Sequence, residues 1–187
     1  MRRLYLVRHG ETGWNAEGRL QGSTDVPLND TGRAQARTLA AAFARLGIAH
    51  VFTSDLMRSQ ETGAIIAEQL GLAAPAVDCD LRERRFGIFE GLTRDEIHAR
   101  YPDEWRAWTG RTHMPEGGEP VESSVGRMRA ALERVWAQAT GPALVISHGG
   151  IMRLWLSDLA GHLLPNIANG ATFVVERDGT AFHARPL

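Results

Sequence analysis

The chain has 187 residues, of which 43% are apolar and 23% charged, which fits a single globular domain with a sizeable core. Its formal net charge of -1 argues against a nucleic-acid-binding surface, because such a surface needs a clustered excess of basic residues. All 21 basic residues are arginine, and the absence of lysine excludes the lysine-dependent phosphate loop, the protein-kinase ATP site and Schiff-base chemistry.

Short β-rich runs alternate with longer segments of helical period, and this pattern is typical of an α/β domain. In chain order, the sequence first predicts a strand over Leu4–Arg8, a helix over Thr31–Leu46, a strand over His50–Thr53 and a helix over Asp55–Leu70 with Gly71 at its C-cap. After the irregular middle of the chain, it predicts a helix over Val121–Ala139, a strand over Ala143–Ser147 and a helix over Gly150–Ala160. The last elements are two strands near Ala171–Glu176 and Thr180–Arg185, with Asp178-Gly179 as their turn. Residues 82–118 contain several glycines and prolines, which predict loops and short helices over the sheet. Because no repeat or linker is visible, we expect one domain over residues 1–187.

The sequence also bears on location, metals and partners. The first seven residues hold two arginines and too few apolar positions for a signal peptide, and charge interrupts every later apolar run. The lone Cys79 cannot form an internal disulfide and lacks the spacing of a zinc site. We therefore expect a cytoplasmic protein that needs no metal or other cofactor and associates with neither membranes nor nucleic acid. A homodimer is possible.

Polar residues follow three of the predicted strands at the point where each strand ends. They form the clusters Arg8–Gly10, Ser54–Arg58 and Ser147–Gly149. In an open parallel α/β sheet, ligands bind beyond the carboxyl ends of the strands. We therefore expect the three clusters to converge on one crevice, with Glu83 as the carboxylate placed over it.

These residue types suit phosphoryl transfer, in which the protein must hold and neutralise negative charge on the phosphoryl oxygens. Arg58, in the first turn of its helix, and Arg8 can bind such oxygens through their guanidinium groups. The neighbouring cations favour a neutral His9, the form of imidazole that acts as a nucleophile. His148 could be protonated and donate to a phosphoryl oxygen, and Glu83 could protonate a departing alkoxide.

At these residues the sequence resembles the histidine phosphatase superfamily, whose best-known members are the cofactor-dependent phosphoglycerate mutases. The similarity runs from the first strand to at least Arg153. It is carried, in order, by Leu6-Val7-Arg8-His9-Gly10-Glu11-Thr12, Trp14-Asn15, Gln21-Gly22, Asp25, Pro27-Leu28, Gly32, Gln35-Ala36, Ser54-Asp55-Leu56, Arg58, Glu61-Thr62, Leu81-Arg82-Glu83, Phe86-Gly87, Glu90-Gly91, Gly118-Glu119 and Ser147-His148-Gly149-Gly150.

The resemblance implies a three-layer α/β/α sandwich around a mixed, mostly parallel sheet, and a site without metal. By motif position, His9 resembles the phosphorylated histidine and Glu83 the proton donor. The implied phosphate pocket comprises Arg8, Asn15, Gln21, Arg58, His148 and the backbone of Gly149. The sequence departs from the family at Gly63, where alanine is usual, and we expect this glycine to cost about 1 kcal/mol of helix stability.

The function that we expect is that of a phosphomonoester hydrolase of histidine acid phosphatase type, acting through a phosphohistidine on a small phosphorylated metabolite. The compact chain resembles the phosphatase branch that includes α-ribazole-phosphate phosphatase. A cofactor-dependent phosphoglycerate mutase is the main alternative, although mutases carry extra segments that close over the site. An inactive phosphate sensor is a further alternative, and the sequence does not identify the substrate.

Two further features of the sequence bear on these alternatives. Ser147 nearly fits a serine nucleophile elbow, but Val145 replaces its first glycine, which disfavours a serine hydrolase. The irregular segment contains side chains that could contact the leaving group, namely Arg84, Arg85, Trp105 and Trp108.

Overall fold

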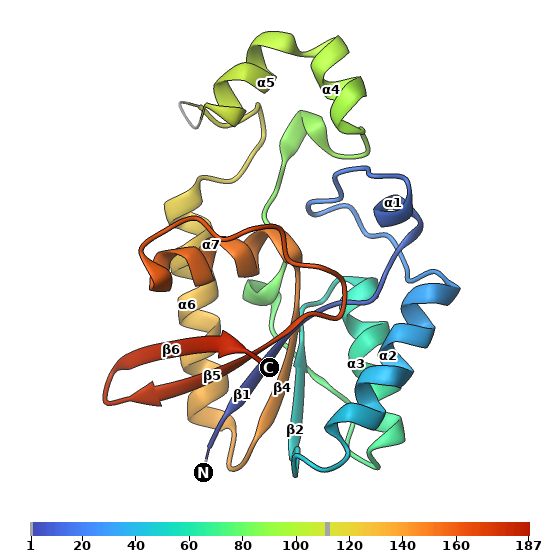
Figure 1. Ribbon diagram of the computed structural model, residues 1–187, viewed down its shortest axis with the longest axis vertical. Coiled ribbons are helices and arrows are strands. Elements are labelled where there is room, and N and C mark those ends of the chain that lie inside the picture. Colours follow the sequence, from blue (N-terminus) through green and yellow to red (C-terminus); the bar gives the residue numbers. More distant parts are fainter. Residues whose placement is uncertain (1, 111–112) are drawn as a thin grey trace.

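In the computed structural model, which describes residues 2–110 and 113–187, six strands form one sheet in the order β3-β2-β4-β1-β5-β6 (Figure 1). The strands are β1 (Leu4–Arg8), β2 (His50–Thr53), β3 (Ala76–Val77), β4 (Ala143–Ser147), β5 (Thr172–Asp178) and β6 (Ala181–Pro186). Four neighbouring strands, β3, β2, β4 and β1, run parallel, whereas β5 is antiparallel to both β1 and β6. The predicted mixed, mostly parallel sheet is confirmed.

Helices cover both faces of this sheet, so the three-layer arrangement is also confirmed (Figure 1). The four main helices are α2 (Asp30–Phe43), α3 (Met57–Gln69), α6 (Val121–Gln138) and α7 (Gly149–Ala160). Successive side chains of a strand point to opposite faces. In β1, Leu4 and Leu6 therefore join the core beneath α6 and α7, whereas Tyr5 and Val7 join the core beneath α2 and α3. Because both faces are covered, β1 is apolar at both sets of positions.

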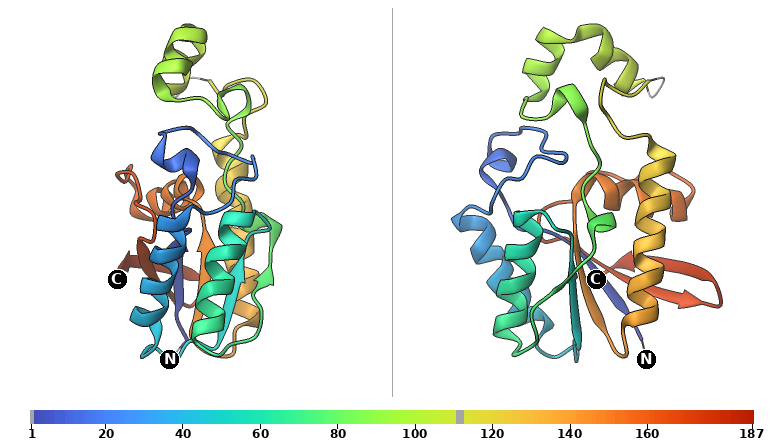
Figure 2. Two further views of the ribbon diagram at one scale, coloured as in Figure 1. Left: turned by 90° about the vertical axis from the view of Figure 1, so that its right-hand side faces the viewer. Right: turned by 180° about the vertical axis from the view of Figure 1, so that it is seen from behind.

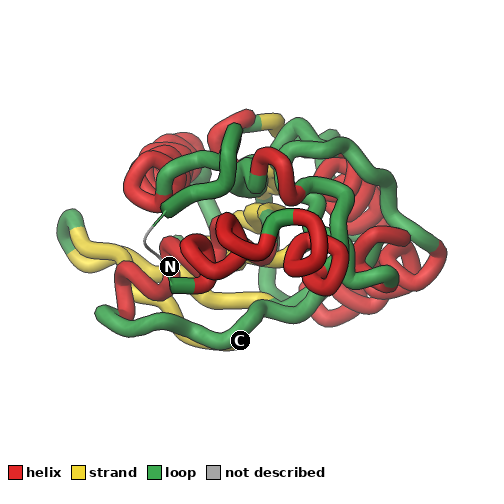
Figure 3. The backbone as a smooth tube through the Cα atoms, turned by 90° about the horizontal axis from the view of Figure 1, so that it is seen from above, coloured by secondary structure: helices red, strands yellow, loops and turns green. Residues whose placement is uncertain are grey.

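The irregular segment forms a cap above the carboxyl ends of the parallel strands, as Figures 1 and 2 show and as Figure 3 shows from above. Its elements are the 3₁₀ helix η2 (Gly87–Phe89) and the helices α4 (Arg94–Arg100) and α5 (Pro102–Thr109). The cap has its own apolar cluster around Phe86, Phe89 and Ile97. The expected short helices over the sheet are thus confirmed, and they place a separately packed unit over the predicted crevice.

Several boundaries differ from the sequence prediction. The helix predicted from Asp55 begins only at Met57, because Ser54 and Asp55 bond to other segments instead of continuing the helix. The β5–β6 turn consists of Gly179 and Thr180, since Asp178 is still paired in the ladder. Three short elements were not expected from the sequence, namely α1 (Gly13–Ala16), the edge strand β3 and the 3₁₀ helix η1 (Cys79–Leu81).

Gly63 has a packing reason that the sequence does not show. A Cβ atom at position 63 would lie 2.4 Å from Cγ2 of Thr53, a branched side chain that cannot swing away. Glycine therefore allows α3 to pack closely on β2. This packing requirement stands beside the cost in helix stability that the sequence predicts for Gly63. Within the part of the chain that the structure describes, no helix is both long and apolar enough to cross a membrane.

Candidate active site

The strand-end residues meet because β1 and β4 are parallel neighbours in register. Arg8 lies opposite Ser147, so the next residues along each strand, His9 and His148, lie side by side with ring centroids 5.0 Å apart. Both imidazoles are buried, and so is Arg58, which enters from the first turn of α3. The sequence prediction that these clusters converge is confirmed.

A cavity of about 290 Å³ opens beside His9, beneath the cap. Seven of the predicted site residues line it, namely Arg8, His9, Asn15, Gln21, Arg58, Glu83 and Gly149. His148 does not line the cavity but lies behind Arg58. From the irregular segment, Arg84 and Trp108 line the cavity, whereas Trp105 packs against Phe89 in the cap.

His9 is held as a neutral imidazole with a defined tautomer. Its Nδ1 lies 2.6 Å from the carbonyl oxygen of Gly10, and since a carbonyl can only accept, Nδ1 carries the proton and donates it. Burial, aided by the positive charges of Arg58 and Arg8, holds the pKa of His9 well below 6.5. The lone pair is therefore on Nε2. This agrees with the neutral form expected from the sequence, but burial is a larger cause than the neighbouring charges.

Arg58 is fixed on three sides. It donates from Nη1 to the carbonyl of Thr24 at 2.8 Å, from Nη2 to the carbonyl of Gly22 at 2.7 Å, and from Nε to Nδ1 of His148 at 3.2 Å. A guanidinium has five N–H donors, so donors remain on the two Nη atoms. Burial lowers the pKa of Arg58 to about 10, which keeps it a cation at neutral pH.

His148 differs from its predicted state. Burial, together with the charge of Arg58, holds its pKa well below 6.5, so the imidazole is neutral and not protonated as the sequence suggested. Because Nδ1 accepts from Arg58, the ring proton is on Nε2, which lies 2.8 Å from Oγ of Ser54. In this structure His148 orients Arg58 from behind.

Arg8 reaches the cavity past the start of α7. Its Nη1 donates to the carbonyl of Ile167 at 2.6 Å, and its buried Nε has no partner among the residues that the structure describes. A Cβ atom at Gly149 would lie 2.9 Å from this Nε. Only glycine at position 149 allows the guanidinium this path.

Glu83 lies at the N-terminus of α7. Its carboxylate accepts backbone N–H groups from Gly150 and Ile151, each at 2.7 Å, and from Arg84 at 2.8 Å. A helix N-terminus favours negative charge, which explains why the single carboxylate of the cavity lining is found here. A Cβ atom at Gly150 would lie 2.7 Å from Oε1 of Glu83, so this glycine too is required by its neighbour.

One positioning residue was missed by the sequence analysis. Asn169, in the connection before β5, donates from Nδ2 to the carbonyl of His9 at 3.0 Å and to Oδ1 of Asn15 at 3.1 Å. The sequence held no signal for it, because asparagine before glycine is most simply read as a turn. Gln21 lines the cavity as predicted, and its buried Oε1 has no partner among the described residues.

The cavity is strongly basic. The arginines that line it are Arg8, Arg19, Arg58, Arg84, Arg94 and Arg153. Such a lining attracts anionic ligands. No cluster of three or more histidine, cysteine, aspartate or glutamate side chains that could hold a metal ion occurs within residues 2–110 and 113–187.

The chain is similar to known proteins in both sequence and fold. The model of the histidine phosphatase superfamily (branch 1) matches residues 4–184. The probable phosphoglycerate mutase GpmB of Yersinia pestis is 39% identical over 166 residues, which cover 86% of this chain and 76% of that protein. The structure of a mycobacterial glucosyl-3-phosphoglycerate phosphatase complexed with VO3 is 28% identical, with a TM-score of 0.86 and coverage of 100% of this chain and 97% of that one. The α-ribazole phosphatase of Shigella flexneri is 25% identical, with a TM-score of 0.85 and coverage of 99% and 95%.

Proposed function

This chain belongs to the histidine phosphatase superfamily, and on that basis we propose that it is a phosphomonoesterase that forms a phosphohistidine at Nε2 of His9. The observation that carries the proposal is the 2.6 Å hydrogen bond from Nδ1 of His9 to the Gly10 carbonyl. It aligns a neutral imidazole with its lone pair on Nε2, beside two arginines.

The first chemical step transfers the phosphoryl group to His9. Nε2 attacks phosphorus, the N–P bond forms, and the bond between phosphorus and the leaving oxygen breaks. Arg8 and Arg58 neutralise the charge on the phosphoryl oxygens, and Arg58 has N–H donors left for that purpose. Glu83, the one carboxylate among the described residues that line the cavity, acts as the proton donor to the leaving alkoxide.

The second step releases phosphate. The Glu83 carboxylate left by the first step takes a proton from water as the water oxygen attacks phosphorus and the N–P bond breaks. His9 returns to its neutral form and Glu83 to its protonated form. His148, which does not line the cavity, supports both steps by holding Arg58 through the hydrogen bond that its Nδ1 accepts.

A phosphoglycerate mutase is the second candidate, and it is favoured by the name of the Yersinia relative. The two candidates share the phosphohistidine and differ in the acceptor, which is water or a second phosphorylated acid. The solved phosphatases match this chain over nearly their whole length, and this supports hydrolysis. We propose that the substrate is a small phosphorylated metabolite. A phosphomonoester screen, including 3-phosphoglycerate with and without its bisphosphate, tests both points.

The covalent step is tested by brief exposure to a labelled phosphomonoester followed by denaturation. The wild type should carry acid-labile, base-stable phosphate, as expected of a phosphohistidine, whereas His9→Ala should carry none. The matched control is His183→Ala, since His183 is an exposed histidine on β6. If the His9→Ala variant turned over the ester at the wild-type rate, the covalent mechanism and the phosphatase proposal built on it would be wrong. Absence of turnover of every ester, with phosphate still bound, would instead identify a sensor.

A further inference from the structure

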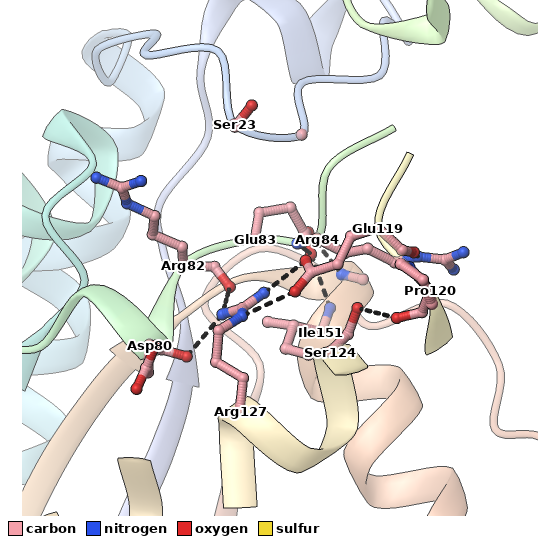
Figure 4. A network of polar contacts seen from close by, with 12 residues as sticks. Ser23, Asp80, Arg82, Glu83, Arg84, Glu119, Pro120, Ser124, Arg127 and Ile151 are labelled. Carbon is pink, nitrogen blue, oxygen red and sulfur yellow. Dashed lines mark hydrogen bonds and ion pairs between the residues drawn. The ribbon is translucent and has the colours of Figure 1, made fainter. Parts of the chain in front are cut away.

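The segment that carries Glu83 lacks a strand partner. After β3 the chain forms η1 and then reaches Glu83, and Oγ of Ser147, at the end of β4, donates to the carbonyl of Leu81. Two carbonyls of this segment are bound by one side chain, because Nη1 of Arg127 donates to Asp80 at 2.7 Å and to Arg82 at 3.0 Å (Figure 4). Arg127 comes from α6, so the backbone on either side of Leu81 is tied to that helix.

Arg127 is itself fixed by Glu119. Its Nε and Nη2 donate to the two carboxylate oxygens of Glu119 at 3.0 and 2.8 Å, and both side chains are mostly buried, at 18% and 10% exposure (Figure 4). Burial raises the pKa of Glu119, but the hydrogen bond and charge of Arg127 outweigh it and leave this pKa below its ordinary value. The backbone of Glu119 accepts from Nε of Arg84 and donates to the carbonyl of Arg85. Both sides of Glu83 are therefore bound through this pair.

The carboxylate and the backbone of Glu83 have different supports. The carboxylate is held by the backbone of α7, through Gly150 and Ile151. The backbone is held by the Arg127–Glu119 pair and by Oγ of Ser147, which donates to the carbonyl of Leu81 at 2.8 Å. Without the pair, the bond from Ser147 would remain, but the carbonyls of Asp80 and Arg82 would lose the donor from α6 while the carboxylate stayed attached to α7.

We propose that Arg127, paired with Glu119, is a positioning residue that sets the reach of Glu83 toward the leaving-group oxygen. This inference rests on the proposed role of Glu83 as proton donor. Arg127 does not line the cavity, so it must act through the segment that it binds. Misplacing a catalytic group by about 1 Å can cost about 100-fold in rate, which makes such an effect measurable.

The test compares the rate of His9 phosphorylation for two esters, measured as the pre-steady-state burst. An alkyl phosphate needs a proton on its leaving oxygen, whereas p-nitrophenolate departs unaided. For Arg127→Met we expect the alkyl-ester burst to slow by about 10- to 100-fold and the aryl-ester burst to change little. Arg127→Lys keeps one donor group for the carbonyls and should recover part of the alkyl-ester rate. In the Glu83→Gln background, Arg127→Met should cause no further loss.

The matched control is Arg129→Met. Arg129 lies on the same helix but is exposed and pairs with Asp158 at 2.7 Å, so both ester rates should stay at the wild-type level. Suppose that the loss of burst rate in Glu83→Gln depends on the leaving group. The positioning role is then wrong if Arg127→Met slows the bursts of both esters by the same factor. It is also wrong if the losses of the two single variants multiply in the double variant. If Glu83→Gln itself slows both esters equally, the proton-donor role fails and the positioning role with it, while the label on His9 is unaffected.

Circular dichroism and thermal unfolding establish whether each variant folds. Should Arg127→Met not fold, Arg127→Lys and Glu119→Gln take its place, because both keep the size and polarity of the buried side chain. At least one of them must then show the selective loss on the alkyl ester. If the burst rates of both esters changed by the same factor relative to the wild type in these variants, the proposal would be overturned.

Discussion

Gly149 lies so close to Arg8 that a Cβ atom at position 149 would come within 2.9 Å of Nε and 3.1 Å of Cδ. The contact is with Cδ, Nε and Cζ in the outer part of the arginine side chain, and the guanidinium is held there because Nη1 is bound to the carbonyl of Ile167. The guanidinium therefore has little freedom to yield. We therefore expect a glycine at the start of α7 to be a condition for placing Arg8, one of the two arginines proposed to bind the phosphoryl group.

Gly149→Ala should accordingly lower kcat/KM by displacing Arg8, by about 10²-fold if the effect resembles the loss of one preorganised donor. Steady-state kinetics on a phosphomonoester measures it. Gly126→Ala is the matched control, since no atom lies within 4 Å of a Cβ there. That control should keep full activity and gain about 1 kcal/mol of helix stability. Wild-type kinetics in Gly149→Ala would show that Arg8 can relocate without loss.

Arg58→Lys should be a poor replacement although the charge is kept. An ammonium carries three N–H donors on one atom, so it cannot reach the carbonyls of Gly22 and Thr24, Nδ1 of His148 and a phosphoryl group together, as the five donors of the guanidinium can. We expect kcat/KM to fall by at least about 100-fold. Arg129→Lys, at an exposed ion pair, is the control and should be unaffected. Unchanged kinetics in Arg58→Lys would place Arg58 outside the binding machinery.

The stability of the protein should fall in mild acid because two imidazoles are buried in neutral form. His9 and His148 have pKa values well below 6.5 in the native protein, mainly through burial. Below about pH 6.5 the unfolded chain binds protons that the native chain does not, so each group lowers the free energy of unfolding by about 1.4 kcal/mol per pH unit. Their stabilising contribution is therefore complete above this pH and declines below it.

Urea unfolding between about pH 7.5 and pH 5 measures this loss. His148→Gln should show a shallower decline than the wild type, because one of the two groups has been removed. Parallel curves for the two proteins would mean that His148 titrates alike in the folded and unfolded states.

Gly63→Ala should destabilise the protein by about 1–3 kcal/mol, the usual cost of overpacking, although alanine is the better helix former. The reason is the 2.4 Å approach to Cγ2 of Thr53. Thr53→Ser removes that methyl group, so the double variant should regain the stability lost in Gly63→Ala. A thermal-unfolding cycle of the four proteins shows this. Strictly additive effects would contradict the contact.

Activity should survive exhaustive chelation and be blocked by vanadate, which can mimic five-coordinate phosphorus. The reason is that Arg8 and Arg58 supply the positive charge that a divalent ion would otherwise bring to the phosphoryl group. Activity before and after dialysis against a chelator measures it. Loss of activity that a divalent ion restored would contradict the arginine-based site.

Much of the site could be predicted from the sequence because of where buried strands end. β1 and β4 are almost entirely apolar, and a polar residue that directly follows such a strand lies beyond its carboxyl end. That rule placed His9, His148 and their neighbouring glycines. The series of motifs then indicated the family and its three layers. These inferences need only neighbours along the chain and the general geometry of parallel sheets.

Other features depend on contacts between distant parts of the chain. Asn169 bonds to the carbonyl of His9 across 160 positions, and Arg127 binds the Glu83 segment from 45 positions away. The neutral state of His148 and the need for glycine at position 63 likewise follow from what packs around them. The sequence by itself determined which chemical groups follow the ends of the central strands, among them His9 and Arg8. Only the tertiary structure decided their protonation and support, because burial and hydrogen-bond partners are properties of the packed molecule.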